Sequence, residues 1–202
     1  MRKFSRAAEP AICTAHSARW NTQWAERRAA NPNAAFSWYV HEGMSARDHM
    51  LPVLREQSQS HCSFCDAFPV DGVSNETIEH FRPKTKSEFY ELAYTWSNLY
   101  YCCDACQSSK RERWDEQLLC PDAIGYSFSK FFEFDFTTGA IRPNSLASPE
   151  DQQRAAVTLE LYGLDSPARR RNRRNELEKF AKTPVGEIVD KFWAYRDFLG
   201  LE

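Results

Sequence analysis

The chain has 202 residues, of which 42% are hydrophobic and 14% aromatic, and its formal net charge is −2. This composition indicates a folded protein with a real core and excludes an intrinsically disordered chain. The near-neutral charge weighs against a protein that coats nucleic acid by bulk electrostatic attraction. Basic residues are concentrated locally instead, with seven Lys/Arg against two Glu between residues 166 and 182.

Cysteine content and hydropathy indicate the compartment. No run approaches 18 apolar residues, and the first residues, Met1 to Ser5, lack the apolar stretch of a signal peptide. We therefore expect a soluble, cytoplasmic protein that does not enter a membrane. Seven cysteines in a reducing compartment favour metal binding or free thiols over disulfides, and an odd number cannot all pair within one chain.

Residues 1–60 have the pattern of helices rich in aromatic side chains. Trp20 and Trp24 are one helical turn apart, which predicts a helix that buries both. A second helix is expected to begin at Ser45, because Asp48 three positions later completes a capping box, and Pro52 is expected to shorten or kink it. Most of the aromatic side chains are expected in the core, with a surface for partner docking as the alternative.

Residues 61–125 are irregular and turn-rich, which is typical of small folds built around a metal ion. Two C-x-x-C pairs, Cys62/Cys65 and Cys103/Cys106, are separated by 37 residues (66 to 102). Two such pairs favour a tetrahedral zinc site with four thiolate ligands, which would be structural because it leaves no position open for substrate.

The cysteine pairs are also compatible with a different ligand set or with no metal at all. The neighbouring His61 and Cys102 could each replace one of the four ligands. The four thiols could also be buried without a metal, or they could belong to a thiol redox protein.

Residues 126–202 are expected to form a β-hairpin followed by helices. Phe132, Phe134 and Phe136 alternate on one face of a strand, a turn follows at 137–139, and residues 140–142 return. Capping residues then predict three helices. The first begins after Ser148 and ends at Gly163, the second runs from Asp165 or Ser166 to about Lys182, and the third runs from Thr183 to near Gly200.

Between the cysteine pairs lie residues suited to phosphodiester hydrolysis, which requires a base to deprotonate water and charge stabilisation on the phosphate. His80, whose ordinary pKa is about 6.5, can accept the proton if it is kept neutral. The adjacent Glu79 offers a carboxylate to a divalent ion. Neighbouring side chains diverge on an extended strand, so local twisting must bring these two together.

This pattern resembles the HNH endonucleases and, more narrowly, the PtuB-type subunits of Septu anti-phage defence systems, some of which are coupled to retrons. The matching segments are 1–3, 61–62, 79–84, 96–99 and 159–174, so the resemblance covers most of the chain. It implies an α+β fold in which a zinc-supported ββα-metal nuclease core, residues 61–125, is flanked by helical segments at 1–60 and 126–202.

The resemblance also implies roles for individual residues. His80 would activate water, Glu79 and Gln107 would hold one Mg²⁺ or Mn²⁺ ion, and Asn98 would orient the loop around His80. Members of the family usually carry His or Asn directly after the second cysteine pair, so Gln107 departs from the pattern. Its amide oxygen could still reach a metal ion.

Alternative ligands and basic contacts complete the expected site. Asp104 or Asp122 could supply a carboxylate in place of Gln107. The candidate contacts for the phosphate backbone are Arg82, Lys84, Lys110 and Arg111. The arginines between 169 and 174 cover most sides of a helix, so some must be solvated, and others could contact nucleic acid or a partner.

The resulting hypothesis is an HNH endonuclease that cleaves DNA or structured RNA such as tRNA. The resemblance implies a PtuA-like ATPase as partner and, where a retron is associated, a reverse transcriptase with its RNA-linked DNA. Residues 1–60 and the C-terminal helices are the candidate docking surfaces. The alternative is a zinc-bearing nucleic-acid-binding or adaptor subunit with weakened catalysis. In that case Gln107 would be the substitution that weakened it.

Overall fold

The computed structural model describes residues 1–201, which form a mixed α+β fold with three two-stranded antiparallel sheets. The helices and strands, in chain order, are α1 (Ala11–Ala30), β1 (Val40–His41), β2 (Met44–Ser45), α2 (Ala46–Gln57), α3 (Val70–Val73), β3 (Glu76–His80), β4 (Leu99–Cys103), α4 (Asp104–Lys110), α5 (Phe128–Phe131), β5 (Phe132–Asp135), β6 (Ala140–Pro143), α6 (Pro149–Tyr162), α7 (Pro167–Lys182) and α8 (Arg196–Leu199). The predicted α+β class is therefore confirmed.

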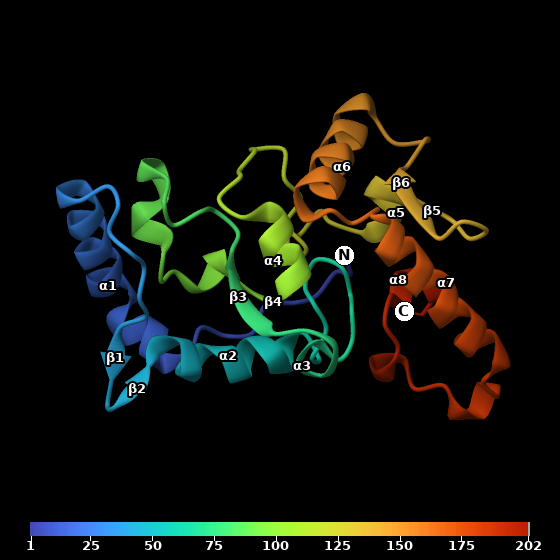
Figure 1. The fold of residues 1–202 in the computed structure, drawn as a ribbon, viewed down its shortest axis with the longest axis horizontal. Helices are drawn as coiled ribbons and strands as arrows, with labels where there is room; N and C mark the ends of the chain where they lie inside the picture. Colours follow the sequence, from blue (N-terminus) through green and yellow to red (C-terminus); the bar gives the residue numbers. More distant parts are fainter. Residues whose placement is uncertain (202) are drawn as a thin grey trace.

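The elements follow one another along the longest axis of the molecule. Figure 1 shows α1 and the β1–β2 hairpin at one end, β3, β4 and α4 in the middle, and α6, α7 and the β5–β6 hairpin at the other end. Among the helices that the structure describes, none combines the length and apolar character needed to cross a bilayer.

The two N-terminal helices agree with the sequence pattern. Trp20 and Trp24 are buried in α1, and the Ser45 side chain caps α2 by accepting a hydrogen bond from the Asp48 amide. Pro52 lies inside α2 without ending it, because the helix continues to Gln57. Asn21 joins α1 to the segment before β4, since its side chain accepts a hydrogen bond from the Tyr94 amide at 2.7 Å.

The central strand pair β3–β4 carries the residues singled out by their sequence. Glu79 lies opposite Tyr100, and His80, the last residue of β3, lies opposite Leu99. All five residues of β4 are buried, so this strand packs on both of its faces. Helix α4 begins at once after β4, with Cys103 as the residue before its first turn.

The hairpin and the two helices after it were also predicted correctly. Strands β5 and β6 pair around the expected turn, and Ser148 and Ser166 cap α6 and α7. Gly139, at φ 71°, closes the hairpin where a Cβ atom would collide with the Arg170 carbonyl oxygen on α7. Gly163 ends α6 in the left-handed conformation, as expected of a helix C-terminus.

The predicted helix from Thr183 to Gly200 is wrong. This stretch instead contains two short 3-10 turns, Val185–Glu187 and Asp190–Phe192, and then the four-residue helix α8. Gly186 and the β-branched residues around it are weak helix formers, so a proline at the expected N-terminus was insufficient to start a long helix.

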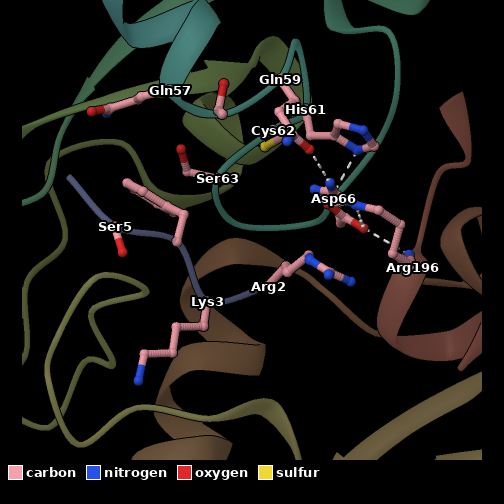
Figure 2. Close-up of a pocket in the computed structure, with 12 residues that line it drawn as sticks. Arg2, Lys3, Ser5, Gln57, Gln59, His61, Cys62, Ser63, Asp66 and Arg196 are labelled. Carbon is pink, nitrogen blue, oxygen red and sulfur yellow. Dashed lines mark hydrogen bonds and ion pairs between the residues drawn. The ribbon is translucent and has the colours of Figure 1, made fainter. Parts of the chain in front are cut away.

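The C-terminal segment packs on the loop that carries the first cysteine pair. Arg196 donates to Asp66 through Nη2 at 2.6 Å and through its amide at 2.7 Å, and both side chains are buried (Figure 2). Although burial acts to raise it, the neighbouring imidazole of His61 and the hydrogen bonds and charge of Arg196 hold the pKa of Asp66 well below its usual range. The pair therefore connects positions that are 130 residues apart.

Candidate functional site

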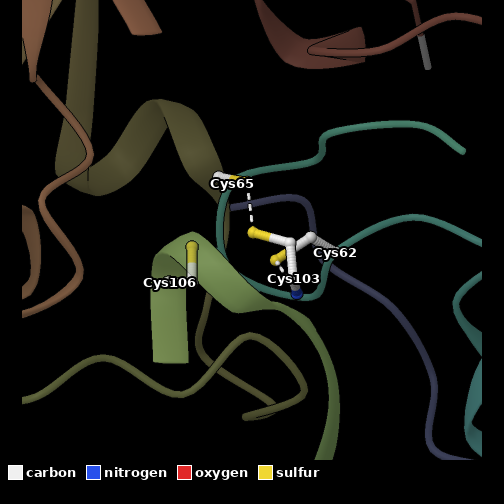
Figure 3. A group of neighbouring side chains, drawn as sticks. All are labelled: Cys62, Cys65, Cys103 and Cys106. Atoms are coloured by element: carbon white, nitrogen blue, oxygen red, sulfur yellow. Dashed lines mark hydrogen bonds between the residues drawn. The ribbon is translucent and has the colours of Figure 1, made fainter. Parts of the chain in front are cut away.

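The four cysteines of the two C-x-x-C pairs lie together. Their sulfur atoms are within 4.8 Å of one another, and all seven cysteines of the chain are free of disulfides. Figure 3 shows Cys62 and Cys65 on the loop before α3, facing Cys103 and Cys106 at the junction of β4 and α4. A tetrahedral zinc ion with Zn–S bonds of about 2.3 Å separates its sulfurs by roughly 3.8 Å, so this donor set fits zinc.

The surroundings of the cluster suit thiolate ligands. Cys62, Cys103 and Cys106 are buried, whereas Cys65 is half-buried. The buried Arg169 of α7 donates to the Cys106 sulfur at 3.0 Å. Four thiolates around Zn²⁺ carry a net charge of −2, so a guanidinium in contact with one sulfur offsets part of that charge in the interior.

The two alternative ligands contact other groups. The imidazole of His61 lies 3.1 Å from an Asp66 carboxylate oxygen and 3.0 Å from the Lys191 carbonyl. The Cys102 thiol donates to the Cys103 carbonyl at 3.3 Å. Neither residue belongs to the group of possible metal ligands, which consists of the four C-x-x-C cysteines alone among residues 1–201.

A separate cavity of about 190 Å³ brings together three of the four predicted catalytic residues. Glu79 and His80 enter it from β3 and Gln107 enters it from α4. Glu79 and His80 line the same space although they are neighbours in sequence, and His80 is the last residue of its strand, where strict alternation ends. The remaining lining residues are Pro83, Lys84, Arg111 and Glu112.

His80 is held as a neutral imidazole. Its Nε2 atom lies 2.9 Å from the Ala93 carbonyl oxygen, to which a neutral ring must donate, so Nδ1 is the nitrogen free to accept a proton. Burial, and then the positive charge of Lys84, lower the pKa of His80 well below its ordinary value. Trp38 stacks on the ring with centroids 5.6 Å apart, and Phe36 contacts it edge-on at 5.2 Å.

Glu79 forms a buried ion pair with Lys110. The Lys110 ammonium donates to Glu79 Oε1 at 2.7 Å and to the His80 carbonyl at 3.0 Å. Burial raises the pKa of Glu79 to about 7, against the opposing charge of Lys110. Lys110 is completely buried, so the structure places it away from the solvent-facing position expected of a phosphate contact.

Asn98 holds the chain that follows His80. Its side-chain oxygen accepts from the Arg82 amide at 2.7 Å, and its amide nitrogen donates to the carbonyls of Arg82 and Leu92 at 3.0 Å. The side chain is buried and contributes no atom to the lining of the cavity. Asn98 therefore fixes the loop that follows β3 through hydrogen bonds to its backbone.

Gln107 lines the cavity with a side-chain carbonyl oxygen that is not used in a hydrogen bond with residues 1–201. Its Nε2 atom donates to the Ile78 carbonyl at 3.1 Å, which leaves Oε1 without a hydrogen bond in the part of the chain that the structure describes. The two carboxylates weighed as replacements do not line the cavity. Asp104 is exposed at the start of α4, and Asp122 accepts from Arg6 and Tyr100 at 2.6 Å.

The other predicted basic contacts differ in position. Lys84 and Arg111 line the cavity, and the Lys84 ammonium lies 3.7 Å from the Glu112 carboxylate. Arg82 is exposed outside the cavity, 5.5 Å above the ring of Trp114.

The arginine-rich part of α7 is divided between the interior and the surface. Arg169 and Arg173 are buried, whereas Arg170, Arg171 and Arg174 are exposed. Sequence reasoning missed the contacts of Phe36 and Trp38 with His80, because no spacing rule links residues so far apart.

Comparison with known proteins relates part of the chain to a Septu protein. No protein-family model matches the chain. The chain is 25% identical over 129 residues to the Septu protein PtuB of Bacillus mycoides (strain KBAB4). The match covers 56% of this chain and 42% of the relative, so the chain spans less than half the length of that protein. This similarity supports a PtuB-like relationship.

Proposed function

We propose that the protein is a metal-dependent HNH endonuclease that hydrolyses phosphodiester bonds in nucleic acid. The observation that carries the proposal is the cavity that Glu79, His80 and Gln107 line together, with His80 held as a neutral base. In this proposal β3, β4 and α4 are the ββα-metal core, and zinc on the four cysteines fixes α4 against the strand pair.

The residues of the cavity suit one divalent ion in addition to the zinc. Glu79 and Gln107 would hold Mg²⁺ or Mn²⁺ through a carboxylate and an amide oxygen, and Mg²⁺ ordinarily keeps several waters beside one or two protein ligands. When bound, the ion would neutralise charge that develops on the phosphate and on the leaving oxygen.

The chain's own residues would perform the remaining steps. His80 Nδ1 would accept a proton from the attacking water, while its Nε2–H bond to the Ala93 carbonyl fixes the tautomer. Lys84 and Arg111 would attract the phosphate backbone into the cavity. Asn98 would keep the loop after β3 in place, so that the imidazole does not move during turnover.

The biological setting is proposed from the similarity to a Septu protein. PtuB belongs to a Septu system, and we propose a defence complex in which this chain works with a PtuA-like ATPase. The comparison gives no support for a retron reverse transcriptase or its RNA-linked DNA as partners.

An adaptor without nuclease activity is the second candidate. The observation in its favour is that the Glu79 carboxylate is already engaged by Lys110. The only other carboxylate that lines the cavity, within residues 1–201, is that of the exposed Glu112. A site with so few free oxygen ligands would suit binding without chemistry.

Nuclease assays separate the two candidates. Purified protein with Mg²⁺ or Mn²⁺ should cut supercoiled plasmid or tRNA, and H80A should reduce the rate by about 100-fold or more, because the general base is removed. H49A is the matched control, since His49 lies outside the cavity and should retain activity. Equal cleavage by wild type and H80A would indicate a contaminant, and inactivity of the wild type, alone and with the ATPase, would favour the adaptor.

The pH dependence of cleavage gives a second readout for His80. A base whose pKa is lowered stays deprotonated to lower pH, so protonation of His80 should lower kcat/KM only well below pH 6.5. The pKa of Glu79 is raised to about 7, so protonation of this metal ligand should cause a separate fall near that pH, which saturating Mg²⁺ shifts to lower pH. A fall centred at or above pH 6.5 that does not move with Mg²⁺ concentration would contradict the assignment of His80 as the base.

A further inference from the structure

One acidic side chain, Glu112, lies among the cations of the cavity around His80. It is half-exposed, whereas His80 is 5% exposed, so Glu112 lies toward the opening of the cavity and His80 toward its floor. Two basic residues, Lys84 and Arg111, line the same space. The proposed nuclease mechanism gives Glu112 no role.

Glu112 connects the two walls of this cavity. Its Oε2 atom accepts a hydrogen bond from the Thr85 hydroxyl at 2.6 Å, and its Oε1 atom lies 3.7 Å from the Lys84 ammonium. Thr85 and Lys84 belong to the segment that follows β3, whereas Glu112 belongs to the segment that follows α4. An anionic group of the chain itself therefore lies beside a cation that the proposed mechanism assigns to the phosphate backbone.

The backbone directs Glu112 to this position. Arg111, the residue after α4, has φ 53° and ψ −131°, a region that favours glycine and is strained for an arginine. The chain turns sharply there, so Glu112 returns to the cavity that α4 lines through Gln107. Strain of this kind persists only where surrounding contacts hold it, and the contacts of Glu112 with Thr85 and Lys84 do so.

We propose that Glu112 makes an autoinhibitory contact, in which its carboxylate occupies the position of a substrate phosphate and must leave Lys84 before nucleic acid enters the cavity. This inference rests on the proposed function, because the competitor is a phosphate-bearing strand. The contact is weak enough to be displaced, since Glu112 is half-exposed and the charged atoms are 3.7 Å apart. A strand presents several phosphates and can engage Lys84 and Arg111 together.

Binding of nucleic acid to the H80A chain tests the proposal without interference from cleavage. Fluorescence anisotropy is measured with fluorescein-labelled tRNA and duplex DNA at one fixed ionic strength. E112Q in this background should bind about three- to fivefold more tightly, because Lys84 no longer has an internal partner. E116Q is the matched control, since Glu116 is exposed, does not line the cavity and should change affinity by less than about twofold.

Two further variants separate a specific contact from a general change of charge. T85V removes only the hydrogen bond that holds Glu112, so it should tighten binding about twofold with no change in net charge. In a double-mutant cycle, K84Q should weaken binding, and E112Q should have no effect once Lys84 is replaced, because the contested cation is then absent. In the active chain, E112Q should lower KM and leave kcat nearly unchanged, since only binding is affected.

Several results would overturn the proposal. These are unchanged affinity in E112Q and T85V, an equal gain in E112Q and E116Q, or weaker binding by E112Q, which would make Glu112 a contact for the substrate or its metal ion. Absence of binding to both probes in every variant would overturn it together with the proposed function. A chain that shows the expected order of affinities but never cleaves would contradict the nuclease alone, and would support competition between Glu112 and nucleic acid.

Discussion

The buried pair of Glu79 and Lys110 is a feature that sequence spacing could not reveal. Its two side chains come from β3 and α4 and are 31 positions apart. From the sequence, Lys110 was expected either to be a solvated helix residue or to contact a substrate phosphate, because it follows the second cysteine pair on a helix. The packing of α4 against β3 turns the ammonium inward instead, to a carboxylate that would otherwise be buried alone.

At pH 8, above the raised pKa of Glu79, we expect K110M to lower the free energy of unfolding by about 3–5 kcal/mol, because the Glu79 carboxylate must then either stay buried without its partner or take up a proton. The double variant E79Q/K110M should recover part of this loss, since neither charge then remains. Urea unfolding followed by circular dichroism measures both. K179M is the control, because Lys179 pairs with Glu176 on the exposed surface of α7 and should change stability little.

Equal stability of K110M and K179M would contradict a structural role for the pair. It would indicate that water reaches Glu79 in solution. In that case E79Q alone should also leave stability unchanged.

At the level of elements, local rules predicted more than long-range rules. The caps at Ser45 and Ser148 were found from sequence because a capping box involves only four consecutive residues. The start of α7 was predicted at Asp165 or Ser166, and the structure shows that Ser166 is the cap. The third C-terminal helix was wrong because a start signal at Thr183 says nothing about the weak helix formers that follow. The pairing of β3 with β4 was expected only through the resemblance to a known family.

The two C-x-x-C pairs are the one long-range contact that was predicted from the residues themselves, because two such pairs are expected to bind the same metal ion. The purified protein should contain about one zinc per chain, and C62S should lose zinc and the cooperative unfolding that depends on it. Metal analysis by mass spectrometry, with thermal unfolding alongside, measures both. C13S is the matched control, since Cys13 is a buried cysteine of α1 outside the cluster.

Zinc-free protein with an unchanged thermal transition would argue against a metal in this cluster. It would favour the interpretation of the four thiols as unligated or redox-active. Loss of zinc in C13S as well as C62S would point to general unfolding rather than to the loss of a ligand.

At the level of the whole molecule, the segments before and after residues 61–125 are attached to it by buried contacts. Arg196 reaches Asp66 from the C-terminal side, and Arg169 reaches Cys106. Composition alone could not show these buried contacts, because an arginine-rich helix is usually interpreted as a solvated or nucleic-acid-binding surface until its neighbours are known. In α7 the buried arginines make structural contacts, and the exposed arginines remain at the surface.

We expect D66N to loosen the C-terminal segment, because Arg196 would be left buried without its counter-charge. Limited trypsin digestion should then cut faster after Lys191, in the segment that leads to α8. E160Q is the control, because Glu160 pairs with Arg113 on the surface. Equal cleavage rates in D66N and wild type would mean that other contacts hold the segment in place.

The contacts of Trp38 and Phe36 with His80 have a consequence for anyone who would shorten the protein to residues 61–125. A fragment cut at residues 61–125 would lack both rings and would open the imidazole to bulk water. The desolvation that depresses its basicity would be lost, and much of the histidine would carry a proton near pH 6.5. The protonation state of His80 is thus set by residues outside 61–125 as well as by those within it.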